Sequence, residues 1–229
     1  AEAGAGRAVG RRATELARAT AALESAEATR RARGRALFVD FEAAPRRVVL
    51  TIDAPEIRAG ERSILRDVRL SLGRSDRVRL CGPNGAGKTT LLARLLRGGD
   101  RRVLFVPQEI PARGTARAID ELRALPREAK GRALSLIAAL GADPGRILGA
   151  GAASPGEARQ LAIAAGLAAR AHTVVLDEPT NDLDLPAIER LEDALASFPG
   201  ALLIVTHDDA LASRLTLDEW RIEGQHVRV

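Results

Sequence analysis

The sequence predicts an α/β fold in which helices flank a mixed, largely parallel sheet. Two observations carry this prediction. Short apolar runs typical of strands alternate with longer helical stretches between residues 36 and 229, an alternation that is typical of a parallel sheet covered by helices. The stretch Gly82–Thr90 also fits the pattern G-x-x-x-x-G-K-[ST] and lies between one such strand and one such helix, the order in which this loop wraps phosphate groups.

The first 35 residues differ in composition from the rest of the chain. They contain eight Arg and four Glu, a net charge of +4, whereas the formal net charge of all 229 residues is +5. Residues 6–33 are rich in Ala, Arg, Glu and Leu without proline, so we expect an exposed helix. Two interpretations stay open: a solvated helix with a few ion pairs, or a basic arm that neutralises RNA phosphates. We therefore divide the chain into residues 1–35 and a domain of residues 36–229.

The domain is expected to open with a partly antiparallel set of strands. Ala36–Phe41 and Arg47–Ile52 have strand composition. Residues 64–72 alternate polar and apolar side chains, as a half-buried antiparallel strand does. Arg77–Cys81 is the strand before the glycine loop, and Cys81, the single cysteine, is expected to be a small buried group.

Behind the loop, strands and helices alternate. Residues 91–96 have helical spacing, and Val103–Val106 is the next strand. The remaining expected elements are helical stretches between residues 115 and 140, helices at 154–169, 186–197 and 208–215, and strands at 173–176, 201–205, 220–222 and 227–229.

The glycine loop is the strongest functional signal. Only two of the 35 basic residues are Lys, and one of them is Lys88 in this loop, where a slim ammonium can reach between β- and γ-phosphates. Backbone amides of the loop can hold the phosphates, and the Thr89 hydroxyl can bind Mg²⁺. The nucleotide-binding residues expected here are Gly82, Asn84, Gly85, Ala86, Gly87, Lys88, Thr89 and Thr90.

Two adjacent acids follow the apolar strand at residues 173–176. Asp177 can bind Mg²⁺, directly or through water, and Glu178 can polarise an attacking water molecule. Adjacent acids are often a surface pair, but their place between an apolar strand and Pro179-Thr180 favours the functional interpretation.

Gln108 and His207 also follow strands. The amide of Gln108 can contact both the metal ion and the attacking water. His207 is delivered to the carboxyl edge of the sheet, where open α/β sheets bind ligands. His172 and His226 lack such a setting, and we expect them to be structural or exposed.

Ser154-Pro155-Gly156-Glu157 fits the capping-box pattern with proline at the first helical position. Taken alone, it indicates a well-formed helix start. The alternative is that this helix start binds a phosphate group brought by another domain, with Gly156 permitting close approach.

These motifs, in this order, resemble the nucleotide-binding domain of ATP-binding cassette (ABC) proteins. The resemblance covers about residues 36–229 and implies a P-loop NTPase fold, ATP as ligand, Mg²⁺ as cofactor and ATP hydrolysis as activity. It implies Gln108 in the Q-loop, Ser154–Glu157 as the signature, Asp177 and Glu178 as Walker B and catalytic base, Asn181–Asp184 as the D-loop, with Asp184 at the nucleotide, and His207 as the switch.

Residues 177–186 look most like the ABC-F group, whose members lack membrane domains, act on ribosomes and carry two cassettes joined by a long charged helical linker. By this resemblance residues 1–35 are the end of that linker, and the chain is a C-terminal cassette. The implied partners are a second cassette and the ribosome or its RNA. The implied role is in translation or in displacing ribosome-targeting antibiotics. The alternative is the ATPase subunit of a membrane transporter.

No apolar run approaches the roughly 20 residues of a membrane span and no signal peptide opens the sequence, so we expect no membrane insertion and a cytoplasmic location.

Several departures from the ABC pattern have consequences. Ala153 and Pro155 replace the usual Leu and Gly of the signature. Only 20 residues separate Lys88 from Gln108 and 66 separate Lys88 from Ser154, which predicts a reduced helical lobe and argues against transport. Ala59-Gly60 lies where an aromatic residue commonly stacks on adenine, so the choice between ATP and GTP stays open.

Overall fold

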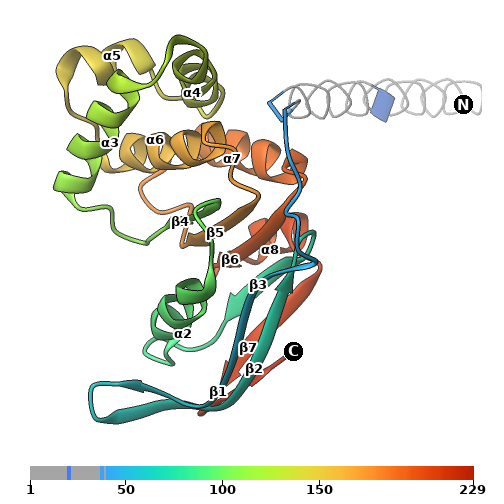
Figure 1. Ribbon diagram of the computed structural model, residues 1–229. Coiled ribbons are helices and arrows are strands. Elements are labelled where there is room, and N and C mark those ends of the chain that lie inside the picture. Colours follow the sequence, from blue (N-terminus) through green and yellow to red (C-terminus); the bar gives the residue numbers. More distant parts are fainter. Residues whose placement is uncertain (1–19, 22–36, 39) are drawn as a thin grey trace, which may run out of the picture.

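The computed structural model describes residues 20, 21, 37, 38 and 40–229. The helix expected over residues 6–33 therefore lies almost entirely outside the described residues. Six strands form the main sheet in the order β4-β5-β6-β3-β7-β8, with all pairs parallel except β7 and β8 (Figure 1). Their bounds are β3 Arg77–Cys81, β4 Val103–Val106, β5 Thr173–Asp177, β6 Ala201–Val205, β7 Asp218–Glu223 and β8 His226–Arg228.

A separate antiparallel hairpin precedes this sheet. It consists of β1 Val48–Ala59 and β2 Arg62–Gly73, which confirms the expected antiparallel opening of the domain. The backbone amide of Arg66 in β2 donates to the carbonyl of Gln225, in the turn between β7 and β8, at 2.8 Å. The hairpin is thereby tied to the edge of the main sheet.

The strand expected at Ala36–Phe41 is wrong for the residues described there. Residues 37, 38 and 40 lie in turns and Phe41 in a loop. Phe38 and Phe41 both pack edge-on against Phe198, with ring centroids 5.5 and 5.6 Å away. Two aromatic rings three positions apart thus share one partner, whereas strand neighbours would alternate between opposite faces.

Helices pack in both hydrophobic cores, α2 in the core of the hairpin and the other helices in the second core (Figure 1). Helices α3, α4 and α5 gather at the end of the molecule opposite the β1–β2 hairpin. The bounds are α2 Lys88–Leu95, extended by a 3₁₀ turn at Leu96–Gly98, α3 Ala112–Ala124, α4 Arg127–Ala139, α5 Pro144–Ala150, α6 Pro155–Ala168, α7 Leu185–Ser197 and α8 Asp209–Leu215. Helix α5 was not expected from the sequence, although the Asp143 side chain caps it by accepting hydrogen bonds from the Gly145 and Arg146 amides.

Two hydrophobic cores lie on opposite faces of the sheet. Successive side chains of a strand point to opposite faces, so Val174 and Leu176 pack with α3, α4, α6 and α7, whereas Val175 packs with α2 and the hairpin. All residues of β5 and β6 are buried, as in a parallel sheet covered on both sides. The two central strands are therefore held firmly, and their ends are fixed points on which a site can be built.

Within the described part of the chain, no single helix is both long and apolar enough to cross a membrane. Helices α4 and α5 reach the length and apolar composition of a membrane span only when they are taken together, and they are bent by 112° relative to each other.

Candidate functional site

Four neighbouring parallel strands end at the same edge of the sheet, and a candidate residue follows each of them. In the order β4-β5-β6-β3, the strands lead to Gln108, to Asp177 and Glu178, to His207, and to the glycine loop that starts at Gly82. The carboxyl edge of an open parallel sheet is where such folds bind ligands. Topology thus brings together residues that are up to 125 positions apart in the sequence.

A cavity of about 640 Å³ lies at this edge. Its size falls within the range of roughly 300–1,000 Å³ typical of small-molecule sites. Ten expected site residues line it: Asn84, Gly85, Gly87, Lys88, Thr89, Thr90, Gln108, Asp177, Glu178 and His207. Six others, Gly82, Ala86, Ser154, Gly156, Glu157 and Asp184, are outside its lining, and Ile64 and Asn181 complete it.

The glycine loop has the backbone of a phosphate cradle. Gly87, the N-cap of α2, has φ +103° and makes no side-chain cap, so the first amides of α2 stay free to bind an anion. A Cβ atom on Gly87 would collide with the side chain of Ile64. The Lys88 ammonium donates to the carbonyls of Gly82 at 2.7 Å and Pro83 at 3.2 Å, which holds it inside the loop.

Asp177 is a buried carboxylate with a raised pKa. It is 5% exposed, and burial raises its pKa most, followed by the negative charge of Glu178. Lys88, a hydrogen bond donated by Thr89, and Arg159 act in the opposite direction. A bound cation would relieve both unfavourable effects. Asp177, the Thr89 hydroxyl and the Gln108 amide are the oxygen ligands that suit Mg²⁺, so these residues fit that ion.

Glu178 and His207 face each other across the cavity. Glu178 has φ +46°, and its amide donates to the Val205 carbonyl at 2.9 Å. The His207 Nε2 atom lies 3.7 Å from Glu178 Oε1 and 3.5 Å from Lys88 Nζ. The imidazole of His207 therefore lies between the Lys88 ammonium and the Glu178 carboxylate, within contact distance of both side chains.

Ser154 begins α6 with the expected capping box, outside the cavity. Its hydroxyl accepts from the Glu157 amide at 3.3 Å, and Glu157 Oε2 accepts from the Ser154 amide at 2.9 Å. Glu157 also pairs with Arg146. Asp184 has a similar role, since it caps α7 by accepting from the Ala187 amide at 2.9 Å. Within this chain these residues shape helix starts.

Three findings at or near the site lie beyond what sequence reasoning assigned. Ala59 and Gly60 are at the tip of the β1–β2 hairpin, and the hairpin residue that lines the cavity is Ile64. Asn181, within the expected D-loop, lines it as well. Arg159 is buried behind the cavity; its only sequence signal is a charge inside the apolar stretch of residues 158–168, which is weak in so Arg-rich a chain.

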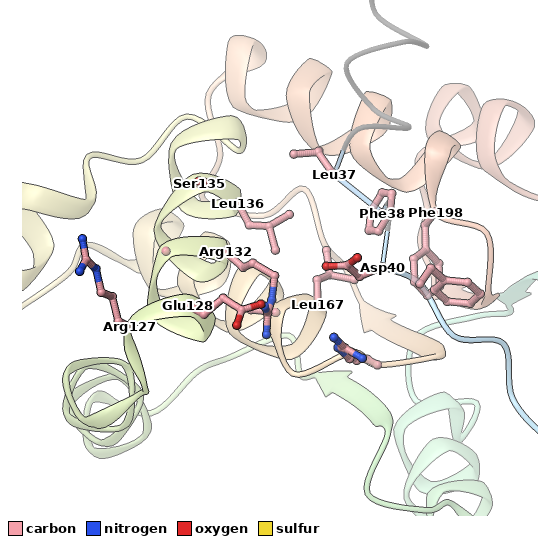
Figure 2. Close-up of a pocket in the computed structure, with 15 residues that line it drawn as sticks. Leu37, Phe38, Asp40, Arg127, Glu128, Arg132, Ser135, Leu136, Leu167 and Phe198 are labelled. Atoms are coloured by element: carbon pink, nitrogen blue, oxygen red, sulfur yellow. The ribbon is translucent and has the colours of Figure 1, made fainter.

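A second cavity, of about 700 Å³, lies between α4, the end of α6 and the residues Leu37, Phe38, Asp40 and Phe41. Figure 2 shows Phe38, Phe198 and Leu136 beside the charged groups of Arg132, Glu128 and Asp40. None of the expected site residues lines it.

His172, which the sequence suggested to be structural or exposed, is buried and structural. Its ring contacts the Thr173 hydroxyl at 2.9 Å and Asp100 at 3.1 Å.

Residues 65–181 match the family model described as "ABC transporter". The ATP-binding protein Uup of Caulobacter vibrioides is 33% identical over 73% of this chain and 31% of its own length. Tylosin resistance ATP-binding protein TlrC of Streptomyces fradiae is 32% identical, over 74% and 41%. Energy-dependent translational throttle protein EttA of Mycobacterium tuberculosis is 32% identical, over 70% and 32%. The chain thus spans between about a third and two fifths of these relatives.

Solved structures share the fold. The ATP-binding subunit of an ABC transporter superposes with a TM-score of 0.63 at 20% identity, covering 79% of this chain and 88% of that one. A bacterial Atm1-family ABC exporter with ATP bound gives 0.62 at 19% identity, over 82% and 39%.

Proposed function

The chain belongs to the ABC transporter family and is an ATPase domain, and from that premise we propose that it hydrolyses MgATP in the cavity at the carboxyl edge of the sheet. The observation that carries this proposal is the joint lining of that cavity by Lys88, Gln108, Asp177, Glu178 and His207. A phosphate loop alone would indicate only nucleotide binding. The two acids and the histidine add the groups that hydrolysis needs.

The residues divide the work as follows. The loop amides and Lys88 would bind the triphosphate, and Thr89, Asp177 and Gln108 would hold Mg²⁺, which would supply positive charge to the phosphate oxygens. Glu178 orients the attacking water and accepts its proton. His207, within 4 Å of both Glu178 and Lys88, senses the γ-phosphate. Catalysis then rests on electrostatic positioning.

The Glu178→Gln variant tests this assignment. It keeps the shape of the side chain and removes the base, so we expect ATP affinity within about threefold of the wild type and turnover lower by about 100-fold or more. Glu189→Gln on the exposed side of α7 is the matched control. Unchanged turnover in Glu178→Gln would remove Glu178 from this role, and a wild-type chain without ATPase activity would refute the proposed function itself.

We further propose that the catalytic site is composite. Ser154, Gly156 and Glu157 begin α6 outside the cavity of their own chain, which supports a role at the nucleotide of a second cassette. ATP would then hold two cassettes face to face, with Asp184 close to the shared nucleotide. Hydrolysis would let them separate.

The wider role that we propose is action on the ribosome, as one cassette of a two-cassette ABC-F protein. Support comes from residues 177–186 and from relatives named for translation or resistance, including EttA and the ribosome protection protein VmlR of Bacillus subtilis, 29% identical over 69% of this chain. The basic residues 1–35 would contact RNA phosphates.

Ribosome binding can be measured by pelleting the Glu178→Gln chain with ribosomes in MgATP, with and without residues 1–35. We expect ATP-dependent pelleting that weakens with added salt and with loss of residues 1–35. Association with a membrane protein instead of ribosomes would favour the transporter alternative.

A further inference from the structure

A buried arginine lies directly behind the two strand ends that carry Gln108 and Glu178. Arg159, in the second turn of α6, is 2% exposed. Its side chain points away from solvent toward the loops that follow β4 and β5. Arginine is rarely buried so completely unless its charge and its donors find partners.

The guanidinium reaches the backbone of both catalytic loops at once. Its Nη1 atom donates to the Glu178 carbonyl at 3.1 Å, and its Nη2 atom donates to the Gln108 carbonyl at 2.7 Å. These contacts use main-chain oxygens, so the side chains of Gln108 and Glu178 stay free to line the cavity. A planar fork with fixed donor directions sets the spacing between two acceptors in a way that a single ammonium does not.

Charge also ties Arg159 to the loop after Glu178. The Arg159 Nη2 atom lies 3.7 Å from Asp182 Oδ2. Burial lowers the pKa of Arg159, while the charges of Asp182, Asp177 and Glu178 raise it. Such a buried cation is costly and adds little to stability on its own. Its Nε atom has no hydrogen-bond partner among the described residues. The guanidinium therefore keeps its contacts with the two carbonyls although one of its own donors stays without a hydrogen bond.

The loop that Arg159 contacts has an unusual backbone. Glu178 and Asp182 both have positive φ, +46° and +62°, a conformation that Asp adopts more readily than most residues and that is uncommon for Glu. The Glu178 carbonyl accepts from the Asn181 amide at 3.3 Å as well as from Arg159. Such local strain persists only where surrounding contacts hold it, and Arg159 supplies contacts at both ends of the strained turn.

We propose that Arg159 is a positioning residue for ATP hydrolysis, which fixes the backbones of Gln108 and Glu178 at a set separation and links both to the start of α6. This inference rests on the proposed function. Ser154 and Arg159 are five positions apart on one helix, a rise of about 7.5 Å. If a second cassette displaced the α6 start, Arg159 would carry that displacement to the catalytic loops of the same chain.

The chain offers a matched control at the next position of α6. Gln160 is also buried, and its Nε2 atom donates to a backbone carbonyl, that of Leu140, at 2.8 Å. That acceptor, Leu140, directly follows α4. Gln160→Leu thus removes a buried hydrogen bond to the backbone from the same helix without touching the catalytic loops.

The first readout is kinetic. For Arg159→Met and Arg159→Lys, corrected for the folded fraction from thermal melts, we expect ATP affinity within about threefold of the wild type and kcat lower by about tenfold or more. Lys restores a charge near Asp182 but does not span both carbonyls, so it should not rescue turnover. Gln160→Leu should keep kcat within about twofold.

The second readout, amide hydrogen exchange of the nucleotide-free chain, needs no activity. Arg159→Met should speed exchange in residues 178–183, whereas Gln160→Leu should speed it around residue 140 instead. If both Arg159 variants keep the kcat of the folded fraction and residues 178–183 exchange as in the wild type, Arg159 is an ordinary core residue and the proposal is wrong. If the wild type hydrolyses no ATP, the proposed function fails, and the exchange pattern alone then decides whether Arg159 holds the loop.

Discussion

Asp177 and Glu178 are adjacent in sequence but meet different surroundings. Asp177 is the last residue of β5 and is buried, with a pKa raised first by burial and then by the charge of Glu178. Glu178 turns away with a positive φ and is partly open to the cavity, its side chain 15% exposed. One acid is thus placed where a cation relieves its burial, and the other where water reaches it.

We predict that Asp177→Asn makes the nucleotide-free chain more stable at neutral pH. An acid with a raised folded-state pKa contributes stability that is fully present below its ordinary pKa of 3.8 and is lost as pH rises through the folded-state value. Asn does not ionise and avoids this loss, so its advantage should grow with pH and then level off. Urea unfolding of both chains from about pH 3.5, below the ordinary pKa, to about pH 8 measures it. An advantage that shrinks as pH rises would contradict the assignment of Asp177 as a buried charge.

At the scale of elements, the central strands, the opening hairpin and the edge strands β7 and β8 were predictable, whereas the segment before β1 and helix α5 were not. The short apolar runs of β5 and β6 favour buried strands, and topology places the polar residues that follow them at one edge of the sheet. The strand expected at residues 36–41 is wrong because Phe38 and Phe41 pack on Phe198, and none of the residues described there belongs to a strand. Ile64 and Arg159 were out of reach because their roles come from contacts with distant segments, such as Gly87, Gln108 and Glu178.

Gly156 gives a prediction about the contact between two elements. A Cβ atom there would lie 2.5 Å from the Asp182 carbonyl oxygen, so Gly156→Ala must push α6 away from the loop of residues 178–183. We expect a loss of about 1–3 kcal/mol in unfolding free energy and slower ATP turnover. Gly131→Ala in α4, where nothing lies within 4 Å, should instead stabilise the chain by about 0.5–1 kcal/mol. Equal effects of the two substitutions on stability would argue that Gly156 serves the helix and not this contact.

For the whole molecule, the expected nucleotide residues fall into two sets that do not meet within one chain. Lys88, Asp177, Glu178 and His207 line the cavity, whereas Ser154 and its neighbours begin α6 outside it. Two chains related by a twofold axis present the same surfaces to each other. Each could then complete the other's site.

Mixing two inactive variants tests this arrangement. Lys88→Ala disables the phosphate loop, and Ser154→Arg places a bulky charge at the start of α6, so each variant alone should hydrolyse ATP at a small fraction of the wild-type rate. In an equal mixture half of the pairs are mixed, and each mixed pair has one site with both halves intact. Turnover per chain should therefore recover to about a quarter of the wild-type value, and should rise with total chain concentration.

Ser154→Arg chains must first be shown to bind ATP like the wild type, because the substituted residue lies outside their own cavity. If the mixture is no more active than its components, or if a wild-type sample shown to be monomeric turns over briskly, each chain holds a complete site and α6 begins with a structural cap alone.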